Sequence, residues 1–208
     1  MRTTTMRPTL SRRGPGAQAG PTSAIARWEI ESRSWGGLIQ PLSGHAKRVL
    51  CLDAIGLCLA SFPPSAPSAP SEPSAPSGPS APSGPSGPSD GEALGERPAR
   101  LARRALDLLR QRADDPSPGP PGEEFLDGLR ALRESGHSPA AASIVTAFTG
   151  YAAAVSAGLS ASDVLVVMAA CCQAVLPAEG AVPAQYADQA LERLVTAQRG
   201  LIEAAAAA

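Results

Sequence analysis

The feature that most constrains this chain is the span from Ser138 to Pro177, forty residues that contain a single formal charge, Asp163. Almost every other residue in the span is small or apolar. Because apolar surface is driven out of water, a folded chain must hide most of these side chains. Any fold of this sequence must therefore supply cover for this span.

Local signals divide the uncharged span into two helices. Ser138 offers an N-cap and is followed by proline at the first helical position, and Gly158 suits the left-handed residue that commonly ends a helix. Ser160 and Asp163 then have the spacing of a capping box, and Pro177 cannot continue a helix. The sequence therefore predicts one helix on each side of Gly158.

The two predicted helices differ in how their side chains are distributed. The first has an apolar stripe at spacings of three and four residues and a small opposite face, which suits a close helix pair or a membrane interface. The second, Val164 to Leu176, is apolar on every side except at Gln173, which predicts a central position. The stripe consists of Ile144, Phe148, Tyr151, Val155 and Leu159, and the small face of Ala142, Thr146, Thr149, Ala153 and Ser156.

The length of the two helices favours burial in protein over burial in lipid. A membrane-spanning helix needs about 20 mostly apolar residues. Val164 to Leu176 is too short for this, and Ala140 to Leu159 is diluted by Ser, Thr, Gly and Tyr. We therefore expect two core helices of a soluble fold rather than a membrane hairpin.

Amphipathic segments that could cover these helices lie on both sides of them. Pro98 to Ala113 and Glu123 to Ser135 show one apolar face each, and a last helix begins near Pro183. Together these segments predict an all-α fold, a compact bundle of about five helices within residues 91–208. The expected core is Leu101, Leu108, Phe125, Leu129, Ile144, Phe148, Val155, Leu165, Met168, Val175, Leu191 and Leu194.

The residues before the bundle have a different composition. Residues 1–48 are basic and rich in Thr, Ser, Gly and Pro, which predicts a mostly disordered region, with a targeting segment as the alternative. Residues 49–62 form a short apolar segment. We expect this segment, Val49 to Phe62, to dock on the bundle or on a partner, with a membrane anchor or an export signal as the less favoured interpretation.

Residues 63–90 form a linker rich in Pro, Ser, Ala and Gly. From Pro64 to Ser89 the dipeptide Pro-Ser recurs nine times at a period of three. Proline at every third position favours polyproline II, so the tract is expected to be a semi-rigid spacer of about 80 Å at ~3.1 Å per residue. Two alternatives stay open, a ligand for proline-binding domains and a site of serine modification.

The charges suggest one candidate interaction surface. Residues 1–62 carry eight Lys or Arg and three acids, while residues 91–208 carry ten and fourteen, and neither part has the strongly basic character of a nucleic-acid-binding domain. The only positive patch expected on the bundle lies on the helix of residues 98–113, where it could bind an acidic partner or phosphate. It consists of Arg100, Arg103, Arg104 and Arg110.

The sequence offers little that points to catalysis. The two histidines, His45 and His137, have no metal-ligand spacing with cysteine, and no phosphate loop or nucleophile elbow is present. Cys171 and Cys172 are adjacent on a helix and point about 100° apart, so they are expected to be buried apolar residues. We predict no cofactor and no metal, and these observations disfavour an enzyme while leaving that alternative open.

Three functional hypotheses follow. The preferred one is a non-catalytic protein-protein interaction module, held away from the N-terminal tail by the proline-rich spacer. The alternatives are a membrane-tethered or exported protein with a Pro/Ser stalk, and a helical domain that binds a small ligand in a pocket with converging polar groups. A cytoplasmic location is favoured, membrane association or export is the alternative, and the oligomeric state is left open.

Overall fold

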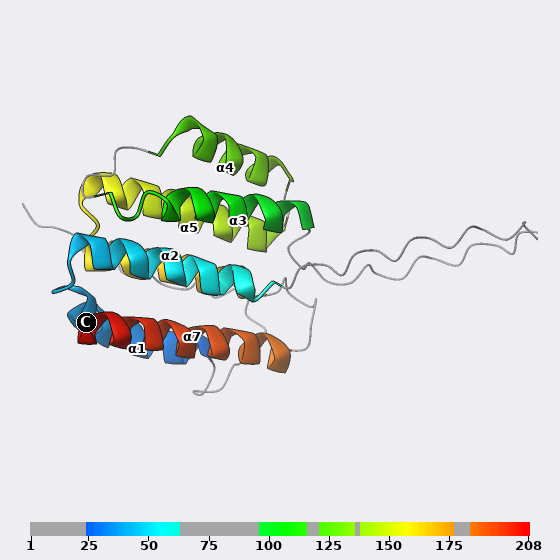
Figure 1. Ribbon diagram of the computed structural model, residues 1–208. Coiled ribbons are helices and arrows are strands. Elements are labelled where there is room, and N and C mark those ends of the chain that lie inside the picture. The colour runs from blue at the N-terminus through cyan, green and yellow to red at the C-terminus, as the bar shows by residue number, and fades with distance from the viewer. Residues whose placement is uncertain (1–23, 63–95, 116–120, 136–137, 177–183) are drawn as a thin grey trace, which may run out of the picture.

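The computed structural model describes residues 24–62, 96–115, 121–135, 138–176 and 184–208, which form seven α-helices and no β-strand. The predicted all-α class is confirmed for these residues. Figure 1 shows the helices stacked with their axes in roughly one direction. In chain order they are α1 (Ala24–Ile39), α2 (Gly44–Ala60), α3 (Glu96–Arg110), α4 (Glu123–Ser135), α5 (Pro139–Ala157), α6 (Ala161–Val175) and α7 (Ala184–Ala207).

The uncharged span forms the predicted pair of helices, α5 and α6, and its ends are capped as the sequence indicates. Ser138 accepts a hydrogen bond from the Ala141 amide, and Gly158 ends α5 in the left-handed conformation with φ 98°. Ser160 and Asp163 form the capping box at the start of α6. Local chemistry therefore determines both ends of this hairpin.

Two helices, α2 and α6, lie at the centre of the bundle. Helix α6 contacts α5, α2, α7 and α1, and α2 contacts α6, α3, α7 and α5. Met168 on α6 and Leu52 and Ile55 on α2 have almost no exposed surface. The central position predicted for α6 is correct, but α6 shares it with a helix that lies before the proline-rich tract.

Five of the seven described helices, α3 to α7, lie within residues 91–208 as predicted, but the bundle is not confined to these residues, because α1 and α2 belong to the same core. Trp28 and Trp35 of α1 are buried edge to face, with ring centroids 6.4 Å apart. The buried positions of α1 recur at spacings of four, three and four residues, a helical pattern that the sequence analysis missed. They are Trp28, Ser32, Trp35 and Ile39.

These helices also correct the boundaries expected before the linker. Residues 24–48 include all of α1 and the start of α2, so they are not part of a disordered region, while residues 1–23 lie outside the described residues. The apolar segment from Val49 to Phe62 continues α2, and its apolar side chains are used inside the bundle. The buried ones on α2 are Leu50, Cys51, Leu52, Ala54, Ile55, Cys58 and Leu59.

The proline-rich tract joins two helices that pack against each other. Arg48 on α2 donates to the carbonyl oxygens of Ala113 and Asp115, and Arg103 on α3 donates to that of Phe62, so α2 and α3 are antiparallel. The tract itself lies outside the described residues. Because both of its flanking helices belong to one core, it cannot separate the bundle from an independent N-terminal tail.

The buried face of α3 also differs from the predicted one. Leu101 and Leu108 are only partly buried, as are Val155 and Val175 in the hairpin. Helix α3 packs against α2 as well as α4, so its buried face is centred on residues that point between these two neighbours. That face contains Ala99, Ala102, Leu106 and Leu109, and the other eight predicted core residues are buried.

We expect the chain to survive cleavage inside the tract. If a protease site is inserted between Ser80 and Ala81, the two fragments of the cut protein should co-elute on size exclusion and melt as one unit. Residues 91–208 expressed alone should not fold, since α6 would lose its contacts with α1 and α2. Separation of the fragments, or a cooperative melting transition for residues 91–208 alone, would show that the two sides of the tract are independent.

A buried charge at the centre of α6 should unfold the protein. Met168 has no exposed surface, so Met168→Asp is expected to lower the free energy of unfolding by roughly 3–5 kcal/mol or more. Val166, two residues away, is 38% exposed, and Val166→Asp should change stability far less. Urea denaturation of both variants at low protein concentration provides the measurement. Equal effects of the two substitutions would refute the central placement of Met168.

Candidate interaction surfaces

All four arginines predicted to form an interaction surface contact other parts of the same chain. Arg110 lies 3.1 Å from the Asp53 carboxylate of α2, and Arg103 donates a hydrogen bond of 2.9 Å to the Phe62 carbonyl oxygen. Both contacts connect α3 to α2. The guanidinium of Arg103 meets the carboxyl end of α2, where the helix dipole favours a positive charge.

The other two arginines of this set are paired with acids. Arg104 lies 2.7 Å from Glu124 of α4, and Arg100 lies 3.7 Å from Glu96 one turn earlier on α3. The side chains of both pairs are at least 60% exposed. Pairs this exposed add little stability. They do reduce the net positive charge that this surface can offer to an acidic partner.

A groove lies over α2, between α3 and α7, and has a volume of about 460 Å³. Its polar groups include the Asp53–Arg110 pair and Asp107, and its apolar surface includes Leu57, Leu106 and Leu201. Gly56 lines the groove, and a Cβ added there would lie only 2.8 Å from Arg110 Nη2, so a larger residue would displace the Arg110 guanidinium. The groove thus gathers polar groups, but two of its charges already neutralise each other.

The small face predicted for α5 is exposed over its whole length. None of its five residues carries a charge, and the exposed hydroxyls hydrogen-bond within the helix. Thr146 Oγ1 donates to Ala142 O at 2.9 Å, Thr149 Oγ1 to Val145 O at 2.9 Å and Ser156 Oγ to Ala152 O at 3.2 Å. If a partner covered this face, these hydroxyl donors would keep their acceptors inside α5 and would not be left without a hydrogen bond. The exposed residues are Ala142, Thr146, Thr149, Ala153 and Ser156.

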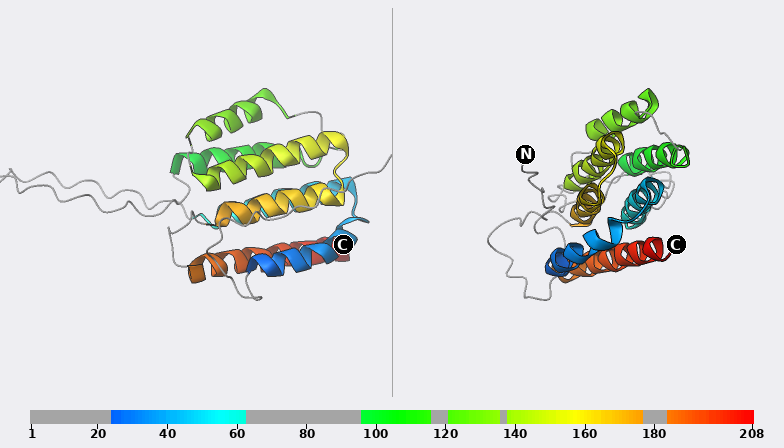
Figure 2. Two further views of the ribbon diagram at one scale, coloured as in Figure 1. Left: turned by 180° about the vertical axis from the view of Figure 1, so that it is seen from behind. Right: turned by 90° about the vertical axis from the view of Figure 1, so that its left-hand side faces the viewer.

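Helix α6 extends this uncharged surface beside α5. The side chain of Leu165 faces Gly36 of α1, where it lies 3.9 Å from the position that a Cβ on this glycine would occupy. The side chain of Val167 faces Gly150 of α5 in the same way, also at 3.9 Å. Successive helical residues point about 100° apart, so Val166 points outward between these two contacts. Figure 2 shows α5 and α6 side by side on the face seen from behind. We call Val166 and the five exposed α5 residues the charge-free face.

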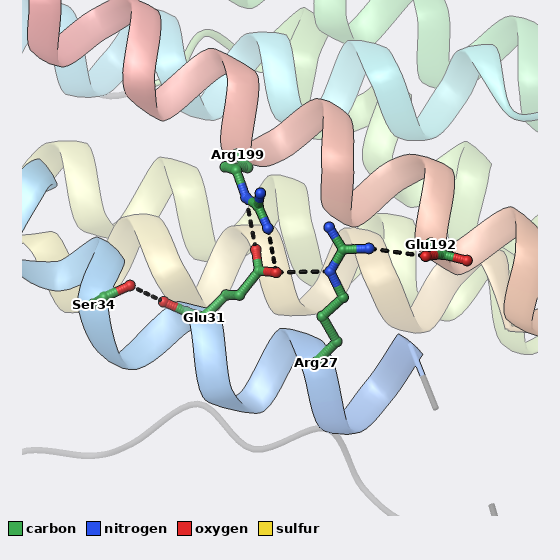
Figure 3. Close-up of polar contacts among 5 residues, drawn as sticks. All are labelled: Arg27, Glu31, Ser34, Glu192 and Arg199. Atoms are coloured by element: carbon green, nitrogen blue, oxygen red, sulfur yellow. Dashed lines mark hydrogen bonds and ion pairs between the residues drawn. The ribbon is translucent and has the colours of Figure 1, made fainter. Parts of the chain in front are cut away.

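A charged cluster connects α1 to α7 (Figure 3). The Glu31 carboxylate accepts hydrogen bonds from Arg27 at 2.7 Å and from Arg199 Nε at 3.0 Å, and Arg27 also reaches Glu192 at 2.9 Å. The hydrogen bond from Arg199 is the main reason that the pKa of Glu31 is lowered, and burial opposes it. The sequence analysis missed this cluster because its members on α1 lie more than 160 residues before its members on α7.

A buried amide connects the same helices in the core. Gln198 Oε1 accepts from the Trp28 indole at 3.3 Å and from the Cys172 thiol at 3.5 Å, while its Nε2 donates to the Met168 carbonyl oxygen at 3.2 Å. Gln198 has no exposed surface. Because a buried polar group without partners is costly, this network favours one position of α1 against α6 and α7.

The four cysteine side chains are part of the buried core. Cys58 donates to the Cys171 carbonyl oxygen at 3.5 Å, and all four cysteines are buried and free. Burial raises the pKa values of Cys51 and Cys172, and contact with Cys58 together with burial raises that of Cys171. Since the thiolate is the reactive form of cysteine, the raised pKa values disfavour reaction at Cys51, Cys171 and Cys172.

Within the described part of the chain, no group of three His, Cys, Asp or Glu side chains is placed to hold a metal ion. The ring of His45 contacts the Ala113 carbonyl oxygen at 3.2 Å, and His137 lies outside the described residues. Burial also raises the pKa of Tyr151 to about 12, so its hydroxyl is protonated at neutral pH.

Helix α5 (Pro139–Ala157) meets the length and composition of a membrane span, with a mean hydropathy of 1.4 over an 18-residue window. In the structure it packs against α6, α4 and α2. Comparison of the chain with known protein families, with curated proteins and with solved structures finds no match. Functional inference therefore depends on the surfaces themselves.

The Glu31 cluster predicts a stability that depends on pH. Because folding lowers the pKa of Glu31, its contribution is present above the pKa of an unfolded glutamate, about 4.3, and is lost as the pH falls through the folded value. Glu31→Gln should therefore lower the urea midpoint at pH 7 and have a smaller effect at pH 3. Glu192→Gln, at a side chain that is 59% exposed, serves as the control and should have a smaller effect at pH 7. A Glu31→Gln effect of equal size at both pH values would contradict this assignment.

Proposed function

We propose that this chain is a non-catalytic protein-interaction module that binds a helix of a protein partner through the charge-free face. The observation that carries the proposal is the surface of α5, which exposes five uncharged small residues along a helix of 19 residues. The hydroxyls of that surface already have acceptors inside the helix. A partner helix can therefore approach closely without leaving charges or donors unpaired.

The contrast with the other surfaces supports this choice of face. Exposed positions of α3, α4 and α7 carry charged side chains such as Arg104, Glu124 and Glu192. The arginines first considered for binding are engaged with Asp53, Glu96, Glu124 and the Phe62 carbonyl group. An apolar partner that bound to these surfaces would have to remove water from the charges, which costs free energy. Binding to the charge-free face does not carry this cost.

The proline-rich tract has a different place in this proposal from the one expected from its sequence. It is an insertion between α2 and α3 of the module, since those helices pack against each other. Its Pro-x-x-Pro repeats keep the spacing that proline-binding domains use, so it is a second, separate means of recruiting proteins.

The test compares proteins captured by the full chain and by two variants. Thr149→Arg places a charge in the centre of the charge-free face, and Thr196→Arg makes the same change at an exposed position of α7. Neither exposed residue is needed for the core, so both variants should keep the circular dichroism spectrum and melting temperature of the parent. Proteins quantified by mass spectrometry should include a set retained by the parent and by Thr196→Arg but lost with Thr149→Arg. Identical sets for all three proteins would overturn the assignment of this face.

A further inference from the structure

Two cysteines from opposite sides of the proline-rich tract meet in the core. Cys58 lies on α2 and Cys171 on α6, the two central helices, and 113 positions separate them in the chain. The Cys58 thiol donates to the Cys171 carbonyl oxygen at 3.5 Å, and a hydrogen bond also joins the two thiol groups. Each of the two residues is only 1% exposed. Their sulfur atoms are therefore neighbours where α2 packs against α6.

The other two cysteines are placed differently. The Cys172 thiol donates to Gln198 Oε1 of α7 at 3.5 Å, since adjacent helical side chains point about 100° apart. Cys51 lies on the same helix as Cys58 but two turns earlier, which is roughly 10 Å at 1.5 Å per residue. A disulfide needs sulfur atoms that can approach each other without a large movement of the backbone. Cys58 and Cys171 are the pair that meets this requirement.

From this contact we propose that Cys58 and Cys171 form a disulfide site, at which oxidation joins α2 covalently to α6. The oxidant is a small disulfide such as glutathione disulfide. The Cys58 thiolate attacks this molecule, forms a mixed disulfide and releases one small thiol, and the Cys171 thiolate then attacks the Cys58 sulfur and releases the second. The two cysteine protons leave with the two released thiols. One protein disulfide and two small thiols are the products.

The position of Cys58 gives the order of the two steps. Helix α2 ends at Ala60, so Cys58 lies in its last turn, and helix ends open more readily than helix centres. Opening of this turn exposes Cys58 to the oxidant. Contact with Cys58 together with burial raises the pKa of Cys171, which makes Cys171 the slower group to attack a free oxidant. As the end of α2 returns, the Cys171 thiol comes next to the mixed disulfide, and this proximity favours the second step.

The cross-link connects the two sides of the tract. Helices α1 and α2 precede the tract and α3 to α7 follow it, so a bond between α2 and α6 keeps the two parts together after a cut in the tract. It also restricts the unfolded chain, which raises the stability of the oxidised protein. In a reducing compartment the same residues stay as thiols. The site therefore makes the connection between the two parts depend on the redox conditions around the protein.

The test uses the full chain with a protease site inserted between Ser80 and Ala81. The folded protein is oxidised with glutathione disulfide, its remaining thiols are blocked, and the tract is then cut. On a denaturing gel without reductant the two fragments should migrate as one band, which dithiothreitol should separate. Mass spectrometry of the oxidised parent should identify Cys58 joined to Cys171, and its urea midpoint should lie above that of the reduced parent.

Matched variants assign the pair. Cys58→Ala and Cys171→Ala should lose the joined band, whereas Cys51→Ala and Cys172→Ala, at thiols that are equally buried, should keep it. The cross-linked peptide from the parent decides the question even if a variant fails to fold. A joined band that persists in Cys58→Ala, a parent linked through Cys51 or Cys172, glutathione held on Cys58 without a cross-link, or four thiols that all stay free would overturn the proposal.

Discussion

The structure depends on hiding the α5–α6 hairpin, in which forty residues carry one charge. Helix α6 has ten buried residues and uses almost its whole circumference for packing. Cover comes from four helices, α1, α2, α5 and α7, two of which precede the proline-rich tract. The hydrophobic effect thus brings together segments that composition alone would assign to different regions of the chain.

This requirement explains why the core extends across the tract. With α3, α4, α5 and α7 alone, the side of α6 that faces α1 and α2 would be exposed to water. Helix α2 can cover this side of α6 because α2 is apolar on most of its circumference, and α1 adds the two tryptophans. Loop-closure entropy grows only slowly with loop length, so a long insertion between α2 and α3 does not prevent their antiparallel packing.

Polar groups then select one arrangement among the many that burial alone would permit. Gln198 forms hydrogen bonds with Trp28, Cys172 and the Met168 carbonyl group at the same time. Nearer the surface, the Glu31 cluster forms a second polar link between α1 and α7. Apolar contacts are tolerant of small shifts, whereas hydrogen bonds require specific distances and directions.

The sequence by itself determined the helices of residues 96–207 and the caps of α5 and α6, because proline, glycine and N-cap residues act on the backbone within a few positions. It also determined the small face of α5 and the need to bury α6. Tertiary structure alone decided that α1 and α2 share the core, that Arg103 and Arg110 contact α2, and that the small face points to solvent. These are contacts between residues far apart in the chain, and the periodicity of one segment records that a face must be buried without recording which other segment will cover it.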